Sequence, residues 1–342
     1  MELAERKRKI LSAIIESYIS TGEPVGSKSL INEAGLEVSS ATVRNEMADL
    51  TNKGFLVQPH TSAGRIPTQQ AYRYYVDNIM SITQVSERGK EYIYSTLSKN
   101  ADSPENILQS GADLLSQLTN YVAVATTPDT IDSRVRKIRF VQIGAYTAMV
   151  VLIASNGTIK TKLFRCEYII TPEMLEIFDK ALNELFAGVK LSTINQPFIQ
   201  TAAARFGELS FFMPSVLTAI KDASDLAQGV SVCNSGITKL MYMSELNIVS
   251  ARGLVEFLNN GHDLSKTLQN LPITTSVSIG LENSRIELAT STVVSTRYSI
   301  DANPSGVLAV LGPLRMDYAR VISILECVSE CVGNLISELI EI

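Results

Sequence analysis

Hydrophobic residues in the first eighty positions recur with a helical period and predict three short helices followed by two short strands. Ile, Leu and Tyr repeat every three or four residues along ERKRKILSAIIESYIS, and glycine-containing segments separate this stretch from the helices that follow. Ser39 or Ser40 can cap the third helix, because a serine hydroxyl satisfies an otherwise unpaired backbone N–H. The predicted elements are helices at 5–20, 26–34 and 39–53 and strands at 55–57 and 65–67. This order is typical of a winged helix-turn-helix domain.

The rest of the chain alternates between helical and strand-like patterns. A tight Asn156-Gly157 turn joins strand-like segments, and a long amphipathic helix closes the chain. The predicted helices cover 69–80, 86–120, 172–187, 198–223, 250–270 and 316–342, and the predicted strands cover 137–155, 158–170, 230–233, 273–280, 286–298 and 307–312. The order indicates an α+β domain with a mostly helical insertion after its first hairpin.

The length of 342 residues predicts two or three domains, because one hydrophobic core does not organise so long a chain. The net charge is −5, but the first 80 residues hold nine basic and nine acidic side chains, so the acidic excess lies wholly outside them. Bulk charge therefore does not predict nucleic-acid binding, which would need a local patch.

Few residues with cofactor or catalytic chemistry are present. The four cysteines form no CxxC pair and indicate buried free thiols in a reducing cytoplasm. The two histidines, His60 and His262, lie far apart, so we expect no metal, no cofactor and no histidine-based catalysis. The charged N-terminus MELAERKRKI does not resemble a signal peptide, and the longest apolar run, AMVVLIA, is too short to span a membrane.

The third predicted helix has a short polar face that suits a DNA groove. If Val43 points inward, the helical period turns Ala41, Asn45, Ala48 and Asn52 outward, with Thr42 and Arg44 at the flanks. Small side chains let a helix enter the major groove, where Asn45 can pair with adenine and Arg44 with guanine. Ser39, Ser40 and Thr42 lie where backbone N–H groups can meet a phosphate. The alternative is an ordinary solvated helix face.

The loop PHTSAGR fits the same hypothesis. His60, Ser62 and Arg65 can contact the sugar-phosphate backbone, or Arg65 can enter a narrow minor groove. Gly64 is expected to permit the tight turn. The alternatives are a solvated hairpin and a winged helix that binds protein, since fold alone does not determine function.

Six sequence motifs, four near the N-terminus and two far downstream, form a recognisable set. They are EPVGSKSL (23–30), VSSATVRNEMADL (38–50), QPHTSAGRIPT (58–68), YRYYVDNIM (72–80), IGLENSRIEL (279–288) and GVLAVLGPLRMDYARVI (306–322). Together they resemble the HrcA family, the heat-inducible transcription repressors of bacteria. The resemblance extends over nearly the whole chain and is weakest at about 170–245.

This resemblance implies an architecture and a function. It implies a winged-helix DNA-binding domain at 1–80, a GAF-like domain with a linker helix at 81–170 and 230–342, and an inserted dimerising domain at 171–229. It implies a homodimer that represses heat-shock chaperone operons by binding double-stranded DNA at an inverted-repeat operator. It also implies that the chaperonin keeps the repressor active until heat-damaged proteins occupy the chaperonin.

The dimer contact is predicted within segment 196–220. The inward residues of the N-terminal domain are used by its own core, whereas this segment is apolar on more than one side. Phe211 and Phe212 are the predicted contact residues. Burial of the segment within its own subunit is the alternative.

Two other classes of function compete with the repressor. A small-molecule sensor could use Arg315 as an anion contact, although a helix-start arginine pairing with Asp317 or Glu282 explains this residue as well. An enzyme could use Glu282 and Glu287, but two carboxylates without a partner histidine are more typical of a solvated strand edge.

Overall fold

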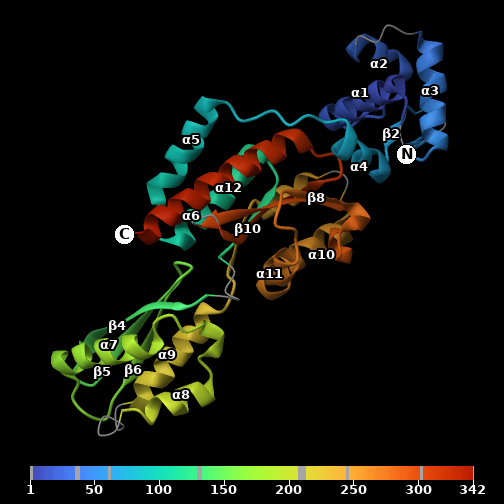
Figure 1. Ribbon diagram of the computed structural model, residues 1–342. Coiled ribbons are helices and arrows are strands. Elements are labelled where there is room, and N and C mark those ends of the chain that lie inside the picture. Colours follow the sequence, from blue (N-terminus) through green and yellow to red (C-terminus); the bar gives the residue numbers. More distant parts are fainter. Residues whose placement is uncertain are drawn as a thin grey trace.

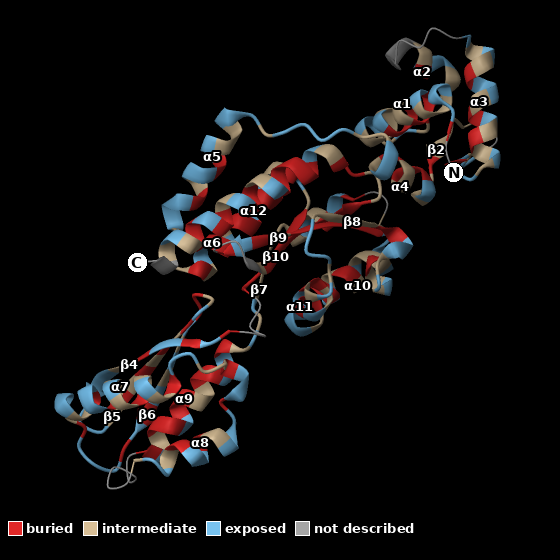
Figure 2. Cartoon of the chain, viewed as in Figure 1, coloured by how far each residue is buried: buried red, intermediate tan, exposed pale blue. Residues whose placement is uncertain are grey.

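The computed structural model arranges the chain as three bodies in a row (Figure 1). It describes residues 3–34, 39–60, 63–128, 133–206, 213–243, 246–300 and 303–341. A helical N-terminal domain lies at one end, a sheet covered by helices lies in the middle, and a smaller sheet-and-helix unit lies at the other end (Figure 1). The buried residues form cores inside each of these bodies (Figure 2). The mixed helix-and-sheet class predicted from the sequence is confirmed.

The N-terminal domain is a winged helix-turn-helix, as predicted. Its elements are α1 (Glu5–Thr21), α2 (Ser27–Ala34), α3 (Ser40–Asn52), the hairpin strands β1 (Leu56–Val57) and β2 (Ile66–Pro67), and α4 (Gln69–Asn78). Helix α1 buries Ile10 and Ile14, and α3 buries Val43, Met47 and Leu50. These side chains recur at helical spacing, so one stripe of each helix faces the shared core.

The central domain is built on a five-stranded antiparallel sheet. Its strands, in spatial order, are β7 (Val232–Ser235), β3 (Val122–Thr126), β10 (Asn303–Pro313), β9 (Ser291–Ile300) and β8 (Ser276–Ile279). Helices α5 (Glu87–Leu97), α6 (Pro104–Thr119) and α12 (Tyr318–Glu341) lie on one side, and α10 (Ile248–Asn259) and α11 (Gly261–Gln269) lie on the other (Figure 1). This is the GAF-like part of the chain.

The strand period explains why helices cover both faces of this sheet. In β3, Ala123 and Ala125 belong to the core shared with α6 and α12, whereas Val122 and Val124 belong to the core under α10 and α11. Every residue of β3 is buried, so VAVAT carries no alternation of polar and apolar positions. Strand β3 was therefore missed by the sequence pattern, which predicts no strand between residues 67 and 137.

The insertion contains its own sheet as well as its helices. Strands β4 (Val135–Gly144), β5 (Thr147–Ala154) and β6 (Ile159–Arg165) pair with one another and pack on helices α7 (Pro172–Phe186), α8 (Gln196–Ala203) and α9 (Met213–Ala227). The domain boundaries expected from the sequence place residues 81–170 in the GAF-like domain and therefore group these three strands with the central sheet. The strand pairing corrects this assignment, because β4, β5 and β6 form a separate sheet. Residues 135–227 are called the inserted unit below.

Several predicted elements differ in detail from the structure. The helix expected at 86–120 is two helices, because Ser103 caps a new helix whose first residue is Pro104. The helix expected at 198–223 is also two, α8 and α9. Residues 286–288, expected to begin a strand, form a 3-10 turn, Ile286–Leu288.

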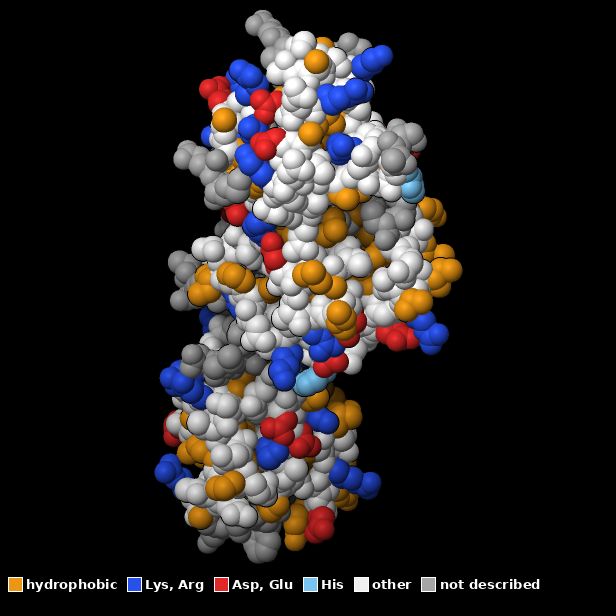
Figure 3. All heavy atoms as spheres, turned by 90° about the vertical axis from the view of Figure 1, so that its right-hand side faces the viewer, with side chains coloured by type: hydrophobic (Ala, Val, Ile, Leu, Met, Phe, Trp, Pro, Cys, Tyr) orange, Lys and Arg blue, Asp and Glu red, His pale blue; other side chains and the backbone are white. Residues whose placement is uncertain are grey.

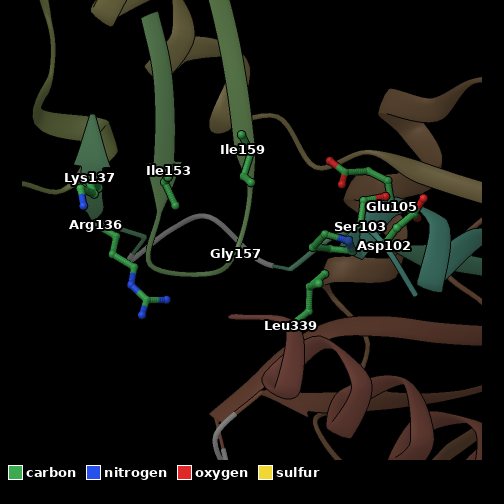
Figure 4. A pocket seen from close by; sticks show the side chains of 10 residues that line it. Asp102, Ser103, Glu105, Arg136, Lys137, Ile153, Gly157, Ile159 and Leu339 are labelled. Carbon is green, nitrogen blue, oxygen red and sulfur yellow. The ribbon is translucent and has the colours of Figure 1, made fainter. Parts of the chain in front are cut away.

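A cleft of about 850 Å³ separates the inserted unit from the central domain (Figure 4). Ile153, Gly157 and Ile159 line it from the β5–β6 hairpin, and the start of α6 and Leu339 of α12 line it from the other side (Figure 4). An ion pair between Lys160 Nζ and Glu105 Oε1, 3.4 Å apart, joins the two parts. The inserted unit therefore presents surfaces that the central domain does not cover.

The packing of α12 on β9 generates a stability prediction. A Cβ added at Gly333 would lie 2.3 Å from the carbonyl oxygen of Ser299, so Gly333→Ala forces the helix away from the strand. We expect a loss of about 1–3 kcal/mol in the free energy of unfolding, measured by urea denaturation. The control is Gly253→Ala in α10, where no atom lies within 4 Å of the new methyl and the substitution should stabilise by roughly 0.5–1 kcal/mol. Equal effects of the two substitutions would contradict this account of the packing.

Candidate nucleic-acid interface

Helix α3 turns outward the side chains that its periodicity predicts. Arg44 and Asn45 are exposed on its outer face, while Val43, Met47 and Leu50 are buried toward the domain core. The exposed positions of the helix are Ala41, Arg44, Asn45, Ala48 and Asn52. The outer face therefore combines small residues with one arginine and two asparagines that can form hydrogen bonds, a combination that suits entry into a major groove.

The three polar residues at the start of α3 already have partners within the domain. The Ser39 hydroxyl accepts a hydrogen bond from the Thr42 backbone N–H at 3.2 Å, and the Ser39 and Thr42 hydroxyls lie 2.9 Å apart. The Ser40 hydroxyl lies 3.3 Å from that of Ser27 at the start of α2. These contacts cap α3 and tie together the two helices of the helix-turn-helix.

Basic side chains hold the two acidic residues of α3. Lys7 of α1 lies 3.3 Å from Glu46 Oε2 and 2.9 Å from Asp49 Oδ2, and Lys53 lies 2.9 Å from the same Asp49 oxygen. Hydrogen bonds from Lys53 and Lys7 lower the pKa of Asp49, so it stays ionised and paired. This pairing between helices was missed, because nothing in the spacing of α1 and α3 residues reveals it. It compensates negative charge that would otherwise oppose DNA.

The hairpin is fastened to the helices at its base. Arg65 exchanges two backbone hydrogen bonds of 2.9 Å with Val25, and its Nε donates to the Thr51 hydroxyl at 3.2 Å. At the tip, His60 is exposed, and its carbonyl accepts from the Ala63 N–H at 2.9 Å. Ser62 lies outside the described residues. Arg65 is therefore half-buried and links the hairpin to α3, a role that the sequence did not predict.

The reason for glycine at position 64 differs from the one expected. Gly64 is not among the glycines with positive φ in the described chain, so a left-handed turn is not what it provides. A Cβ at this position would instead lie 2.4 Å from the carbonyl oxygen of Val25. The residue allows two backbone segments to approach closely.

Positive charge on this end of the molecule is distributed rather than gathered in one patch. Figure 3 shows basic and acidic side chains interspersed on the N-terminal domain, at the top of the view. Lys28 of α2 and Arg44 of α3 are exposed, and neither takes part in an ion pair recorded within the described ranges. These two cations therefore remain available to phosphates or bases.

The other predicted site residues are not brought to this interface. Phe211 and Phe212 lie outside the described residues, but Ile199, Val216 and Leu217 of the same segment are buried in the core of the inserted unit. The described part of segment 196–220 thus supports the alternative of burial within its own subunit.

The three charged residues considered for a ligand or for catalysis have structural partners. Glu282 pairs with Arg73, and Glu287 lies 3.1 Å from Arg285. Arg315 donates to the carbonyl of Ile19. Among the described residues, no group of His, Cys, Asp and Glu could hold a metal ion, and no helix is long and apolar enough to cross a membrane.

Comparisons with known proteins agree on one family. A family model for the HrcA protein C-terminal domain matches residues 105–322. The heat-inducible transcription repressor HrcA of Moorella thermoacetica is 32% identical over 342 residues, covering 99% of each chain. That of Desulforudis audaxviator is 34% identical, also over 99% of each chain. A crystal structure of a hypothetical protein, 23% identical, covers 99% of this chain and 100% of its own with a TM-score of 0.69, which shows a shared fold.

The close approach at Gly64 generates a prediction about the hairpin. Gly64→Ala should push the hairpin away from Val25 and favour local opening by about 1–3 kcal/mol. Amide hydrogen exchange at Val25 and Arg65, whose N–H groups form the two bridging bonds, should accelerate accordingly. The matched control is Gly26→Ala, whose new methyl would lie 3.7 Å from the Ser29 hydroxyl. Unchanged exchange in Gly64→Ala would show that the hairpin is not held by this contact.

Proposed function

The chain belongs to the HrcA family of heat-inducible transcription repressors, and from this premise we propose that it represses transcription by binding operator DNA through α3 and the hairpin. The observation that carries the proposal is the outer face of α3, where Arg44 and Asn45 stand exposed among small residues while the acids of the helix are paired. The protein then acts in the cytoplasm of a bacterium, on double-stranded DNA upstream of heat-shock chaperone operons.

Each interface residue has a distinct role in this proposal. Arg44 and Asn45 read base edges in the major groove, and Ser39, Ser40 and Thr42 present the capped start of α3 to a phosphate. His60, Ser62 and Arg65 bring the hairpin to the sugar-phosphate backbone. Because the Nε of Arg65 is bonded to Thr51, Arg65 also sets the angle between the hairpin and α3.

An inverted-repeat operator calls for a two-fold symmetric dimer, and we place the dimer contact on the outer face of the β4–β5–β6 sheet. Helices α7 and α9 cover the inner face of this sheet. Val141, Met149 and Leu163 lie opposite one another across the outer face, as do Ile153 and Ile159. Val141, Ile143, Ile159 and Leu163 expose 43–63% of their surface. An open apolar sheet face of this kind is covered in many proteins by a second sheet.

We propose that the chaperonin binds a second exposed apolar surface, which lies on the central domain. Figure 3 shows hydrophobic side chains gathered around the middle of the molecule, and six large side chains of the central domain are 77–88% exposed. They come from the 3-10 helix Ile237–Tyr242, from the start of α10 and from the turns at 280–288, and α10 contacts the first and the last of these segments. The six residues, called the apolar patch below, are Met241, Tyr242, Ile248, Val249, Leu281 and Ile286. Chaperones recognise exposed apolar surface, so this patch suits a chaperonin.

The DNA-binding role is tested with Asn45→Ala. We expect a loss of about 1–3 kcal/mol on the inverted-repeat operator and little change on random DNA, because a base contact is specific. Arg65→Ala should weaken binding to both and lower the salt slope by about one unit. Gel-shift titrations at several salt concentrations measure these effects, with Asn259→Ala, an exposed asparagine of α10 outside the winged helix, as the control. Equal losses of Asn45→Ala on both DNAs would exclude base readout.

The dimer contact is tested with Leu163→Glu, which places a charge on the outer sheet face. We expect a folded monomer by light scattering and circular dichroism, with weakened operator binding. Ile177→Glu is the matched control, since Ile177 is 51% exposed on α7 of the same unit. A Leu163→Glu protein that stays dimeric would rule out this face.

The chaperonin surface is tested with the double substitution Ile248→Ser and Val249→Ser. We expect this variant to lose co-sedimentation with purified chaperonin while keeping its fold. The matched control replaces another adjacent exposed pair, Tyr168 and Ile169 of the inserted unit, with serine. If the Ile248→Ser and Val249→Ser variant still binds the chaperonin, the contact does not lie on the apolar patch.

A further inference from the structure

Helix α4 fastens the winged helix to the central domain through Arg73. The guanidinium holds the Glu282 carboxylate with both Nε, at 3.0 Å from Oε1, and Nη2, and Nη2 also donates to the carbonyl of Val277 in β8. Nη1 donates to Asp77 on the same helix at 3.1 Å. A bidentate pair between Arg and a carboxylate fixes direction as well as distance.

A second side chain of α4 strengthens this junction. The Gln69 amide oxygen accepts from the Leu281 backbone N–H at 3.1 Å. A Cβ at the neighbouring Gly280 would lie 2.5 Å from that Gln69 oxygen, so helix and turn are in close contact. The side chains of Arg73 and Glu282 are 29% and 32% exposed, so water screens this pair less than it screens the surface pairs of the chain.

A second polar contact between the two domains lies at the end of α1, where Arg315 meets the helix. This contact and the Arg73–Glu282 pair are called the clamps below. Arg315 Nη1 donates to the carbonyl of Ile19 at 3.4 Å, and its guanidinium carbon would lie 3.3 Å from a Cβ at Gly22, the residue that ends the helix. Helix α1 has no basic residue in its last turn. A cation from the central domain therefore meets the partial negative charge of this helix end.

Buried packing fills the space between the domains. The rings of Tyr72 and Tyr318 lie 5.9 Å apart, and both side chains are nearly inaccessible to water. The core of the winged helix continues through these rings into the core formed by α6, α12 and the sheet. The winged helix is thus held by polar clamps around an apolar contact and not only by the chain that links α4 to α5.

From this geometry we propose that Arg73, Glu282 and Arg315 are positioning residues that fix the orientation of the winged helix and thereby set the half-site spacing that an operator must have. The inference rests on the proposed binding of an inverted repeat by a dimer. When the first half-site is bound, the second is reached only if the other winged helix already points at it. Half-sites on one face of DNA recur about every 10 bp, so a rigid dimer accepts one spacing and a loose dimer accepts many.

Operators with altered spacing test the proposal. DNA fragments carry the two half-sites moved apart in single base-pair steps over one helical turn, and a further fragment carries one half-site alone. We expect the unmodified protein to bind strongly at one spacing. Glu282→Gln and Arg315→Gln should bind the native operator at least about tenfold more weakly, with a flatter spacing profile and unchanged affinity for the single half-site.

Two further variants complete the test on DNA. The double variant Arg73→Gln with Glu282→Gln should lose no more than Arg73→Gln alone, because Glu282 acts on the winged helix through Arg73. Arg252→Gln, which breaks an exposed pair within α10, should behave like the unmodified protein. A spacing profile as sharp as that of the unmodified protein would overturn the proposal, and so would loss of binding to the single half-site, which would indicate damage to the winged helix itself.

A measurement without DNA separates the clamps from the proposed function. Fluorescent labels placed through non-natural amino acids at Lys9 of α1 and Lys99 beside α5 report the distance between the two domains in single molecules. We expect a broader distance distribution in Glu282→Gln than in the unmodified protein. An unchanged width would refute the clamps even if operator binding is confirmed. A broader width without any operator binding would support the clamps and reject the repressor mechanism.

Discussion

The contact between α4 and the edge of the central sheet constrains every other surface of the protein. One face of α4 completes the core of the winged helix with Ala71 and Tyr75, and the same short helix presents Tyr72 and Arg73 to the central domain. A helix of ten residues that serves two domains leaves little freedom between them. The direction in which α3 points is therefore a property of the whole chain and not of the winged helix alone.

The proposed interface with DNA depends on local compensation of charge, because the chain as a whole is acidic. Lys7 and Lys53 satisfy Glu46 and Asp49 on the flank of α3, so the exposed face is left to Arg44 and Asn45. Since these pairs are partly exposed, their contribution to stability is small. Their main physical effect is on the field that an approaching phosphate meets.

The three proposed partners use separate surfaces that the fold keeps apart. In the proposed mechanism DNA binds the winged helix and a second copy binds the sheet of the inserted unit, and these two parts lie at opposite ends of the molecule (Figure 1). The apolar patch lies on the central domain between them, and Leu281 and Ile286 of the patch flank Glu282 in the sequence. A partner bound to this patch would touch the turn that contains Glu282, which pairs with Arg73. Binding at the patch could therefore change the orientation of the winged helix through this ion pair.

Local patterns in the sequence determined the winged helix and the outward face of α3, because a helical period assigns each side chain to a face whatever surrounds the helix. The serine that caps α3 and the two-stranded hairpin were also predictable, because caps and tight turns depend on residues that are neighbours in the sequence. Only the tertiary structure decided which side chains meet across elements: Lys7 with Asp49, Arg73 with Glu282, and Arg315 with the end of α1. It also assigned strands β4 to β6 to the inserted unit and α8 and α9 to an internal core. The apolar residues of a strand or helix predict that it is buried, but they do not show which element covers it. That element is distant in the sequence and comes close only when the chain folds.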